Sequence, residues 1–302
     1  MSPDSTDKKS CFVAQIDLSL KEKLQNDLID QGFQLTTPPY TLFSAQKKGV
    51  SCTLYTSGKL TVQGKDKEDF IHFYLEPEIL KALTYSHPEI DIDLTPRIGI
   101  DEAGKGDFFG PLCIAGVYGD ETTIKELLAI GVKDSKTISD KNILILKNKI
   151  QRLCPHSIVR LPPKKYNELY TNFRNLNRLL GWGHATAICE LVAKTGCHNV
   201  IIDQFANENV VESALRQKHL EANLTQKHKA ESDPVVAAAS ILARAAFLEG
   251  LEKLGEKVGM VLPKGASQAV ISAGKALVAR QGEGILEEVA KLHFKTKQDV
   301  LR

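Results

Sequence analysis

The cysteines of this 302-residue chain form no CxxC pair, and the six of them are scattered through apolar runs such as GPLCIAG and TAICELV. This spacing excludes the common zinc-finger patterns, and it favours buried, reduced thiols over a disulfide framework. An excess of positive charge is also absent, because the net charge at pH 7 is only +2. A nucleic-acid partner would therefore be bound by a local basic surface and not by the field of the whole chain.

Long apolar segments are missing as well. No apolar run approaches the roughly 18 residues that a membrane span needs, and the first ten residues, MSPDSTDKKS, lack the apolar core of a signal peptide. With 42% hydrophobic and 25% charged residues, the composition is that of a globular protein. We expect a cytoplasmic protein that makes no membrane contact, and nothing in the sequence demands more than a monomer.

The N-terminal part of the chain predicts a small α+β domain. Leu20, Leu24 and Leu28 would share one face of a helix that begins at Ser19. Alternating apolar residues in VSCTLY and KLTVQ predict a β-meander, and residues 67–83 predict a second helix. The two prolines and alternating acids of TYSHPEIDIDLTPR indicate a linker.

Beyond the linker the pattern changes. Apolar strands alternate with long helical patterns, and this order predicts an α/β domain with a central mixed sheet. The predicted strands lie in RIGIDEAG, PLCIAGVYG, SIVRLPP and NVIIDQF. We therefore divide the chain into an N-terminal domain, residues 1–90, and a larger domain, residues 91–302.

Two of these strands end in an acidic residue. RIGID leads into Asp101, which Glu102 follows, and NVIID ends at Asp203. Active sites of α/β folds lie at the carboxyl ends of strands, so adjacent strands would bring Asp101 and Asp203 side by side. Two unpaired carboxylates raise each other's pKa, whereas a divalent cation turns them into a hard oxygen site suited to Mg²⁺ or Mn²⁺. Each acid alone could equally be a turn former or a helix N-cap.

A further acid precedes a long apolar helix. In HKAESDPVVAAASILAR, Pro234 suits the first helical position and Asp233 suits the N-cap. Glu231 lies just outside this helix and is left free to reach a metal ion. The small side chains of residues 237–240 would let the helix approach the sheet closely, which would hold Glu231 near the acids of the strands.

The acids share a loop with glycines, although glycine loops usually approach phosphate and carboxylates repel it. Metal ions would resolve this conflict, because they would convert the acids into a site that stabilises the attacking and leaving oxygens of a phosphodiester. Gly104 and Gly106 would let main-chain N–H groups contact a nucleic-acid backbone beside that site. The acids of the predicted site are Asp101, Glu102, Asp203 and Glu231.

Five motifs in this order resemble those of bacterial ribonuclease HIII, one of the type 2 ribonucleases H that cut the RNA strand of RNA–DNA hybrids. They are IGIDEAGKGDFFGPL, KDSKTIS, YNELY with NLNRLLGWGHATAI, VIIDQF and KAESDPVVAAASILARAAF. The resemblance spans most of residues 95–295. The N-terminal YTLFSAQKKGVSCTLYTSGKLTVQGK resembles the extra domain of ribonuclease HIII, which is folded like the TATA-binding protein and helps to hold the hybrid.

The resemblance implies a ribonuclease H-like fold with a mixed five-stranded sheet and a metal site formed by the same four acids. It implies that Mg²⁺ or Mn²⁺, as two ions, activates water, and that the RNA strand is cut to leave 5′-phosphate and 3′-hydroxyl ends. It also implies that Gly104, Lys105 and Gly106 touch the 2′-hydroxyl, the group that distinguishes RNA from DNA.

Lys105 departs from the usual pattern of this family. The loop reads Gly-Lys-Gly, which is closer to the Gly-Arg-Gly of ribonuclease HII than to the Gly-Thr-Gly of ribonuclease HIII. Ribonuclease HII also uses a late tyrosine to recognise a lone ribonucleotide, and this chain has no tyrosine beyond Tyr170. We therefore expect cleavage of longer RNA tracts and leave cleavage at a single embedded ribonucleotide open.

Other polar residues fit either a structural or a substrate-binding role. Ser135 and Lys136, in KDSKTIS, suit phosphate contact or a capped turn. His184 could shuttle protons or make a structural hydrogen bond. Asn175 and Asn177 could contact the substrate backbone or cap a helix. Lysines at the turns of the predicted meander fit a nucleic-acid platform or a solvated surface.

Two other functions compete with a nuclease. GIDEAGKG nearly fits a nucleotide-binding P-loop, but Gly106 replaces the Ser or Thr that would hold Mg²⁺, and Asp101 and Glu102 would lie inside the anion site. The second alternative is a non-catalytic protein that binds RNA–DNA hybrids. Binding alone gains nothing from buried negative charge, and the set of four acids therefore favours the enzyme.

Overall fold

The computed structural model describes residues 11–81, 93–203, 209–227 and 230–302. The chain divides into two compact units, Met1–Asp93 and Leu94–Arg302. The predicted domain boundary, between residues 90 and 91, lies outside the described residues. Each unit is described by itself below.

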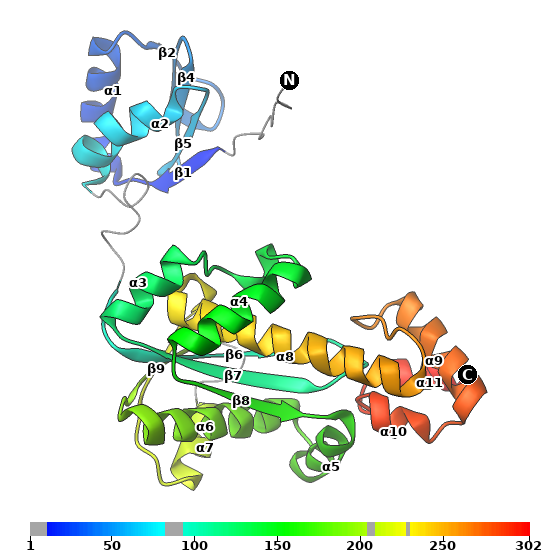
Figure 1. Cartoon of the computed structure of the whole chain (residues 1–302). Helices are drawn as coiled ribbons and strands as arrows, with labels where there is room; N and C mark the ends of the chain where they lie inside the picture. The colour runs from blue at the N-terminus through cyan, green and yellow to red at the C-terminus, as the bar shows by residue number, and fades with distance from the viewer. Residues whose placement is uncertain (1–10, 82–92, 204–208, 228–229) are drawn as a thin grey trace, which may run out of the picture. The chain divides into compact units, whose positions relative to one another are not determined.

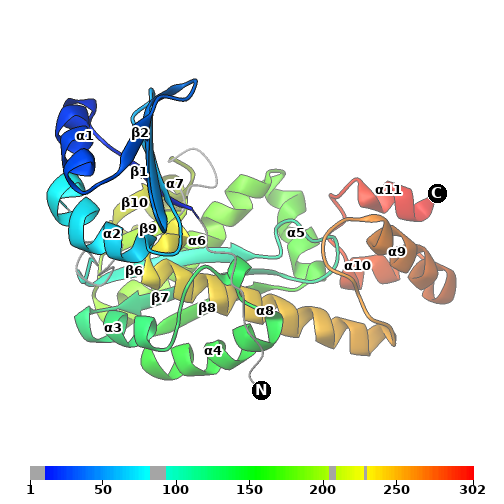
Figure 2. The ribbon, with the colours of Figure 1, turned by 90° about the horizontal axis from the view of Figure 1, so that it is seen from above.

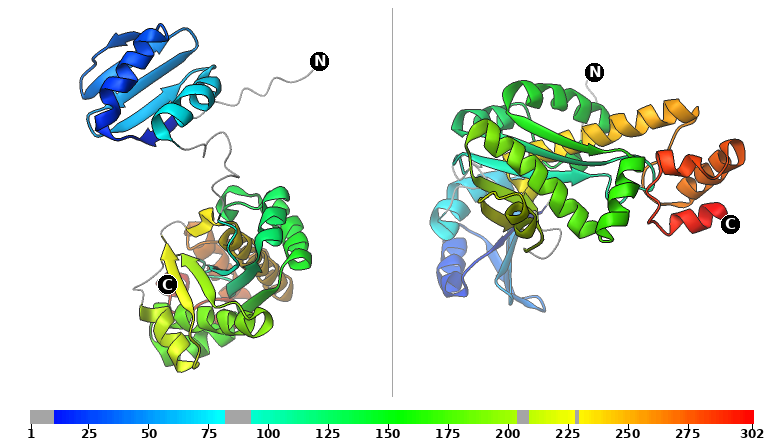
Figure 3. Two further views of the ribbon diagram at one scale, coloured as in Figure 1. Left: turned by 90° about the vertical axis from the view of Figure 1, so that its left-hand side faces the viewer. Right: turned by 90° about the horizontal axis from the view of Figure 1, so that it is seen from below.

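The N-terminal unit is a five-stranded antiparallel sheet in the order β1-β5-β4-β3-β2. Figure 3 shows helices α1 and α2 on one face of this sheet. Its elements are β1 (Phe12–Gln15), η1 (Leu18–Leu20), α1 (Lys21–Asp30), β2 (Gln34–Thr36), β3 (Thr41–Lys47), β4 (Val50–Tyr55), β5 (Lys59–Gln63), α2 (Lys67–Phe70) and η2 (Ile71–Leu80).

The core of this unit follows the apolar periodicity of the sequence. Leu24 and Leu28 of α1 are fully buried, and the inward residues of β4 and β5 are buried, so the predicted helix and meander are confirmed. The helix begins at Lys21 and not at Ser19, because Leu20 belongs to the short helix η1 and is only partly buried. The second predicted helix is present as α2 and η2, but η2 is a π-helix that contains Pro77. Proline lacks an N–H group and clashes with the preceding turn of an α-helix, and the wider π turn accommodates it.

The larger unit has one five-stranded mixed sheet in the order β10-β9-β6-β7-β8. Strands β10, β9 and β6 are parallel to one another, and β7 is antiparallel to both β6 and β8. The elements are β6 (Arg97–Ala103), β7 (Leu112–Gly119), α3 (Glu121–Ala129), η3 (Ser135–Thr137), α4 (Asp140–Leu153), β8 (His156–Leu161), α5 (Pro163–Phe173), α6 (Leu176–Thr195), β9 (Asn199–Asp203), α7 (Asn209–Gln217), β10 (Asn223–Lys227), η4 (Ala230–Ser232), α8 (Pro234–Val258), α9 (Gln268–Gln281), α10 (Ile285–Val289) and α11 (Thr296–Leu301).

This architecture confirms the predicted α/β class with a central mixed sheet flanked by helices. Four of the five strands coincide with the apolar segments identified from the sequence. The fifth, β10, has the polar sequence NLTQK and alternates between exposed and partly buried positions. It lies at the edge of the sheet, where one side of the strand has no partner and a continuous apolar run is not required.

Helices cover both faces of the mixed sheet. Helices α3, α4 and α8 lie on one face, and α6 and α7 lie on the other (Figure 1). Figure 2 shows α8 running along the sheet, with α9, α10 and α11 gathered near its C-terminal end. These last helices form an apolar cluster with Phe108, Phe109 and Phe247.

Helix α8 lies unusually close to β6. A Cβ atom at Gly99 would be 2.5 Å from the main-chain nitrogen of Val236 and 2.6 Å from the carbonyl carbon of Val235, so only glycine fits there. Contrary to the expectation from the sequence, α8 is long and apolar enough to cross a membrane by length and composition. However, 72% of its most apolar window is buried inside the fold, which is typical of a core helix.

Candidate active site

The parallel pairing of β6 and β9 brings two acids to the same edge of the sheet. Ile100 of β6 is paired with Ile202 of β9, so the next residues, Asp101 and Asp203, are neighbours. Glu102 follows directly, and β6 ends at Ala103, before Gly104 with a φ of +87°. The predicted juxtaposition of the two strand ends is therefore present.

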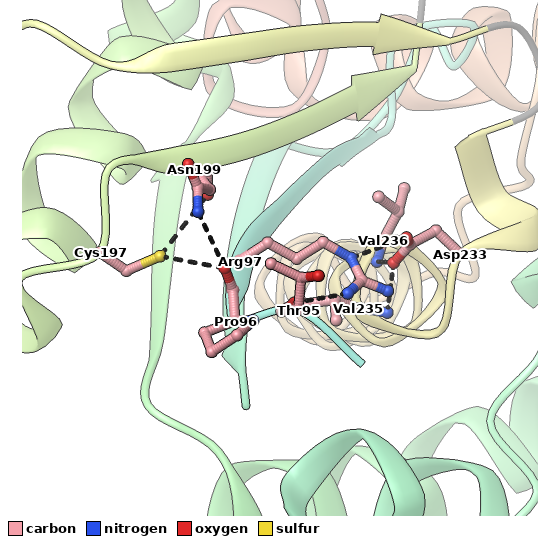
Figure 4. A network of polar contacts seen from close by, with 8 residues as sticks. All are labelled: Thr95, Pro96, Arg97, Cys197, Asn199, Asp233, Val235 and Val236. Carbon is pink, nitrogen blue, oxygen red and sulfur yellow. Dashed lines mark hydrogen bonds and ion pairs between the residues drawn. The ribbon is translucent and has the colours of Figure 1, made fainter. Parts of the chain in front are cut away.

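Glu231 is held near these strands by the start of α8. The Asp233 side chain accepts hydrogen bonds from Val235 N at 2.9 Å and Val236 N at 3.4 Å, which makes it the N-cap as predicted. Its other oxygen accepts a hydrogen bond from Nε of the buried Arg97, at 2.8 Å. Figure 4 shows this network, which ties the first turn of α8 to the beginning of β6.

A second hydrogen bond joins the segment of Glu231 to β9. Oδ1 of Asp203 accepts from Ala230 N at 3.2 Å, and Ala230 begins η4, the short helix that contains Glu231. Glu231 is thus fixed on one side by Asp203 and on the other by the capped start of α8. Its side chain retains 20% exposure and is accessible to a ligand.

All four predicted acids line one cavity of about 420 Å³. The glycine loop and the turn of Ser135 and Lys136 also line it, as does the exposed side of α8 near Arg244. The lining consists of Asp101, Glu102, Ala103, Gly104, Lys105, Gly106, Asp107, Ser135, Lys136, Asp203, Glu231, Ser240, Arg244, Phe247, Leu248 and Lys264. The acids therefore open into a common space despite their separation in the sequence.

Two lysines contact the acids of this cavity. Nζ of Lys105 lies 3.4 Å from Oε1 of Glu102, and Nζ of Lys136 lies 3.3 Å from Oε1 of Glu231. Within the described residues, no group of three or more His, Cys, Asp or Glu side chains is arranged so that it could hold a metal ion. The acids share a cavity, but these side-chain positions do not form a closed set of ligands.

Burial and mutual repulsion distribute the charge of the paired acids unequally. Burial, together with the charge of Glu102, raises the pKa of Asp101 to about 7. Burial alone would also raise the pKa of Glu102, but hydrogen bonds and charge from His184 and Lys105 outweigh it, and the pKa of Glu102 is lowered. Glu102 is therefore the anionic member of the pair at neutral pH, and a cation would favour ionisation of Asp101 as well.

His184 is a buried residue that contacts the carboxylate of Glu102. Its side chain is only 1% exposed, and Nε2 lies 3.1 Å from Oε2 of Glu102. The sequence left a proton shuttle and a structural hydrogen bond open for this residue. Because the ring is buried and contacts the acid directly, the geometry favours the role of orienting the Glu102 carboxylate.

The three residues of the glycine loop differ in their surroundings. Gly104 is buried, and a Cβ atom there would lie 2.3 Å from the carbonyl oxygen of Pro111, whereas a Cβ at Gly106 would meet nothing within 4 Å. Lys105 is partly exposed and contacts Glu102. Gly104 thus shapes the loop, and Gly106 leaves its main chain open to the cavity.

The remaining predicted substrate residues divide into two groups. Ser135 and Lys136 line the cavity, but Ser135 is buried and its hydroxyl shares a 2.7 Å hydrogen bond with that of Ser240. Asn175 and Asn177 do not line it. Asn175 is the N-cap of α6 and accepts a hydrogen bond from Arg178 N, so its side chain already has a structural function.

Sequence reasoning missed two cations at the rim of the cavity. Arg244 comes from α8 and Lys264 from the segment after it, and both contact the Asp140 carboxylate. Neither residue belongs to a pattern that distinguishes it from other surface cations. Only the packing of α8 against β6 and α4 brings them to the cavity.

Comparison with known proteins identifies the family of this chain. A family model described as ribonuclease HII matches residues 98–297, and a second model, described as a domain of unknown function, matches residues 11–85. Ribonuclease HIII of Protochlamydia amoebophila is 58% identical over 290 residues, 96% of each chain. Ribonuclease HIII of Chlamydia trachomatis serovar L2 is 47% identical and covers 97% of this chain and 98% of the relative.

Solved structures with the same fold cover nearly the whole chain. One, described as Bst-RNase HIII in complex with Mn²⁺, is 30% identical with a TM-score of 0.69 and covers 97% of this chain and 98% of its own. Another, RNase H3 of Aquifex aeolicus, is 29% identical with a TM-score of 0.57 and covers 94% and 100%. By sequence over both units and by fold, this chain belongs to the ribonuclease HIII family, endoribonucleases that act on RNA–DNA hybrids.

Proposed function

We propose that the cavity at the ends of β6 and β9 is the site where this chain hydrolyses the RNA strand of an RNA–DNA hybrid, leaving 5′-phosphate and 3′-hydroxyl ends. The observation that carries the proposal is that four acids from three separate segments line one cavity together with the glycine loop. The P-loop alternative lacks support, because Asp101 and Glu102 line the space that a nucleotide phosphate would need.

We further propose that Asp101, Glu102, Asp203 and Glu231 hold two divalent ions, Mg²⁺ or Mn²⁺. Carboxylate oxygens are the ligands that these ions prefer, and the related Bst-RNase HIII has been solved as a complex with Mn²⁺. When bound, such ions supply an activated water and stabilise charge on the attacking and leaving oxygens. Binding would require the more exposed ammonium groups of Lys105 and Lys136 to move away from the carboxylates of Glu102 and Glu231.

The residues around the acids would position the substrate. Lys136 is 73% exposed in its side chain, so once Glu231 binds a cation its ammonium can contact a backbone phosphate. Once Glu102 binds a cation, the ammonium of Lys105 can likewise contact a phosphate. The open main chain at Gly106 can approach the 2′-hydroxyl of a ribose without steric conflict, which would select RNA.

We assign the N-terminal unit to binding of the hybrid. The face of its sheet away from the buried core presents a row of hydroxyls at paired positions, Thr36, Ser44, Thr53 and Thr61. Hydroxyl groups contact sugar and phosphate without reading sequence. Lys47, one of the lysines expected to form a basic platform, donates instead to the carbonyl oxygen of Gln31 at 2.7 Å. Hydroxyl groups therefore form much of the proposed contact surface.

We propose that the protein is cytoplasmic and acts as a monomer. All six cysteines are free, which fits the reducing environment of the cytoplasm. Within one chain, the described residues supply all four acids and the loop that would touch the substrate. A monomer is therefore sufficient for the reaction.

The test compares Asp101→Asn with Glu126→Gln, which changes an exposed acid of the same unit. Product mapping on end-labelled RNA–DNA duplex, with Mg²⁺ and Mn²⁺ in separate reactions, should show that Asp101→Asn abolishes cleavage while hybrid binding persists. Glu126→Gln should cut as the unsubstituted protein does. A chain that binds the hybrid but cuts it with neither ion would establish the non-catalytic alternative.

A further inference from the structure

Lys291 is a charged residue with no access to solvent. Its exposure is 0%, and it lies two residues after the end of α10. Nζ donates to the main-chain carbonyl oxygens of Gly110 at 2.7 Å, Asp107 at 2.8 Å and Phe109 at 3.4 Å. An ammonium group has three N–H donors, and each of them has a carbonyl of the same turn as its acceptor.

These carbonyls belong to the segment that connects the glycine loop to β7. Asp107 follows Gly106 directly, and β7 begins at Leu112. Phe108 and Phe109 are fully buried, so the carbonyl groups between them have little access to water. Buried carbonyl groups need hydrogen-bond donors, and a lysine supplies three from one side chain.

The main chain around Lys291 holds the same segment. Lys291 N donates to the carbonyl oxygen of Phe108 at 2.8 Å, and Gly110 N donates to that of Val289 at 3.0 Å. Asp107 is held separately, because its Oδ1 accepts from Gly265 N at 2.6 Å. The C-terminal residues of the chain thus fix residues 107–110 from several directions, although about 180 residues separate the two segments in sequence.

Filling space does not by itself explain a lysine at this position. Leucine or methionine would fill the same volume without the free-energy cost of removing an ammonium group from water. Among the described residues, no carboxylate lies within ion-pair distance of Lys291. The charge of Asp107 and the ring of Tyr166, 5.9 Å from Nζ, offset part of the cost, and the three carbonyls are the direct hydrogen-bond partners of the ammonium group. A role in fixing residues 107–110 explains both the charge of Lys291 and its three contacts with main-chain carbonyls.

We propose that Lys291 is a positioning residue for the hybrid-cleaving reaction. By holding residues 107–110, it fixes the exit of the glycine loop, and it thereby sets the orientation in which the main chain of Gly104, Lys105 and Gly106 faces the substrate. The inference rests on the function proposed above. It assigns a part in that reaction to a residue that lies outside the catalytic cavity.

The test uses Lys291→Met in the full-length chain, with the exposed Lys295→Met as the matched control. Hydrogen exchange of amides 104–110 should accelerate about tenfold or more in Lys291→Met, while amides of β6 and α8 remain protected. The KM for an RNA–DNA hybrid should rise at least threefold. A merely smaller folded fraction would lower the apparent kcat and leave KM unchanged. Lys295→Met should change neither quantity.

Unchanged exchange at 104–110 and an unchanged KM in a folded Lys291→Met would overturn the proposal. If this variant fails to fold, hydrogen exchange of the unsubstituted protein tests the proposal. Amides 107–110 should then exchange as slowly as the amides of β7. Exchange at 107–110 as fast as in the exposed turn at residues 131–134 would also overturn the proposal. If the unsubstituted chain cuts no hybrid, the proposed function fails. The exchange result would then still report whether Lys291 holds the turn.

Discussion

The carboxylate of Glu102 has two basic neighbours with different exposures. Lys105 is 38% exposed in its side chain, whereas His184 is 1% exposed. An exposed ammonium can leave when a cation binds, but the buried imidazole has no other space to occupy. His184 would therefore keep the carboxylate in place in both states, and this arrangement leads to the first prediction at the scale of single residues.

Replacing His184 with alanine should weaken metal binding about tenfold to hundredfold, the usual effect of losing a residue that orients a ligand. Calorimetric titration of the protein with Mn²⁺, without substrate, measures the change directly. His198→Ala changes an exposed histidine of the same unit and should leave the affinity unaltered. Equal affinities in the His184 variant and the unsubstituted chain would show that this contact is incidental.

Lys291 predicts a dependence of stability on pH. Burial lowers the pKa of Lys291 from 10.5 to about 7, so the folded chain keeps the ammonium form with three donors below about pH 7. Between the two values the unfolded chain binds more protons than the folded one. Stability should therefore rise with pH in this window, by at most about 1.4 kcal/mol per pH unit. The unfolding free energy of the unsubstituted chain minus that of Lys291→Met, measured in urea titrations, should be larger at pH 9 than at pH 7. A difference that is constant or smaller at pH 9 would contradict the lowered pKa.

At the scale of elements, the position of Glu231 depends on how closely α8 approaches β6. The capped start of α8, the ion pair of Asp233 with Arg97 and the absence of a side chain at Gly99 all act at this crossing. The sequence predicted the cap and the small residues of the helix. It did not identify Gly99 as the residue that permits the contact, because only the tertiary structure shows which strand residue faces the helix.

Gly99→Ala should destabilise the larger unit by about 3 kcal/mol, since the new methyl group meets main-chain atoms that cannot rotate away. Displacement of α8 should also move Glu231 and reduce cleavage beyond the loss of folded protein. Gly284→Ala is the matched control, because its Cβ would meet nothing within 4 Å. Urea unfolding and activity per folded molecule measure the two effects. A Gly99→Ala protein as stable as the control would mean that the contact is looser than described.

At the scale of the whole molecule, each unit has an apolar core of its own. Among the described residues, one apolar cluster contains residues of the N-terminal unit, and three further clusters contain residues of the larger unit. Each unit can therefore fold by itself. A hybrid held by both units would be bound more tightly than by either, because the second contact forms within one complex.

A chain that begins at Leu94 should retain cleavage at high hybrid concentration but bind the hybrid at least about tenfold more weakly. Titration of labelled hybrid in Ca²⁺, followed by rates in Mn²⁺, separates binding from cleavage. If the shortened chain binds as tightly as the full one, the N-terminal unit has some other function.

Local sequence patterns determined much of this protein. Apolar runs that end in Asp101 and Asp203 specify strands with acids at their ends, and Asp233 with Pro234 specifies a helix start, because these signals involve residues only a few positions apart. The edge strand β10 escaped prediction because its polar alternation resembles that of a loop. Only the tertiary structure decided that Lys136 contacts Glu231, that Ser135 is buried against Ser240 and that Lys291 donates to the carbonyl of Gly110. These contacts join residues roughly 95 to 180 positions apart, and they depend on strand order and helix packing, which no short stretch of sequence encodes.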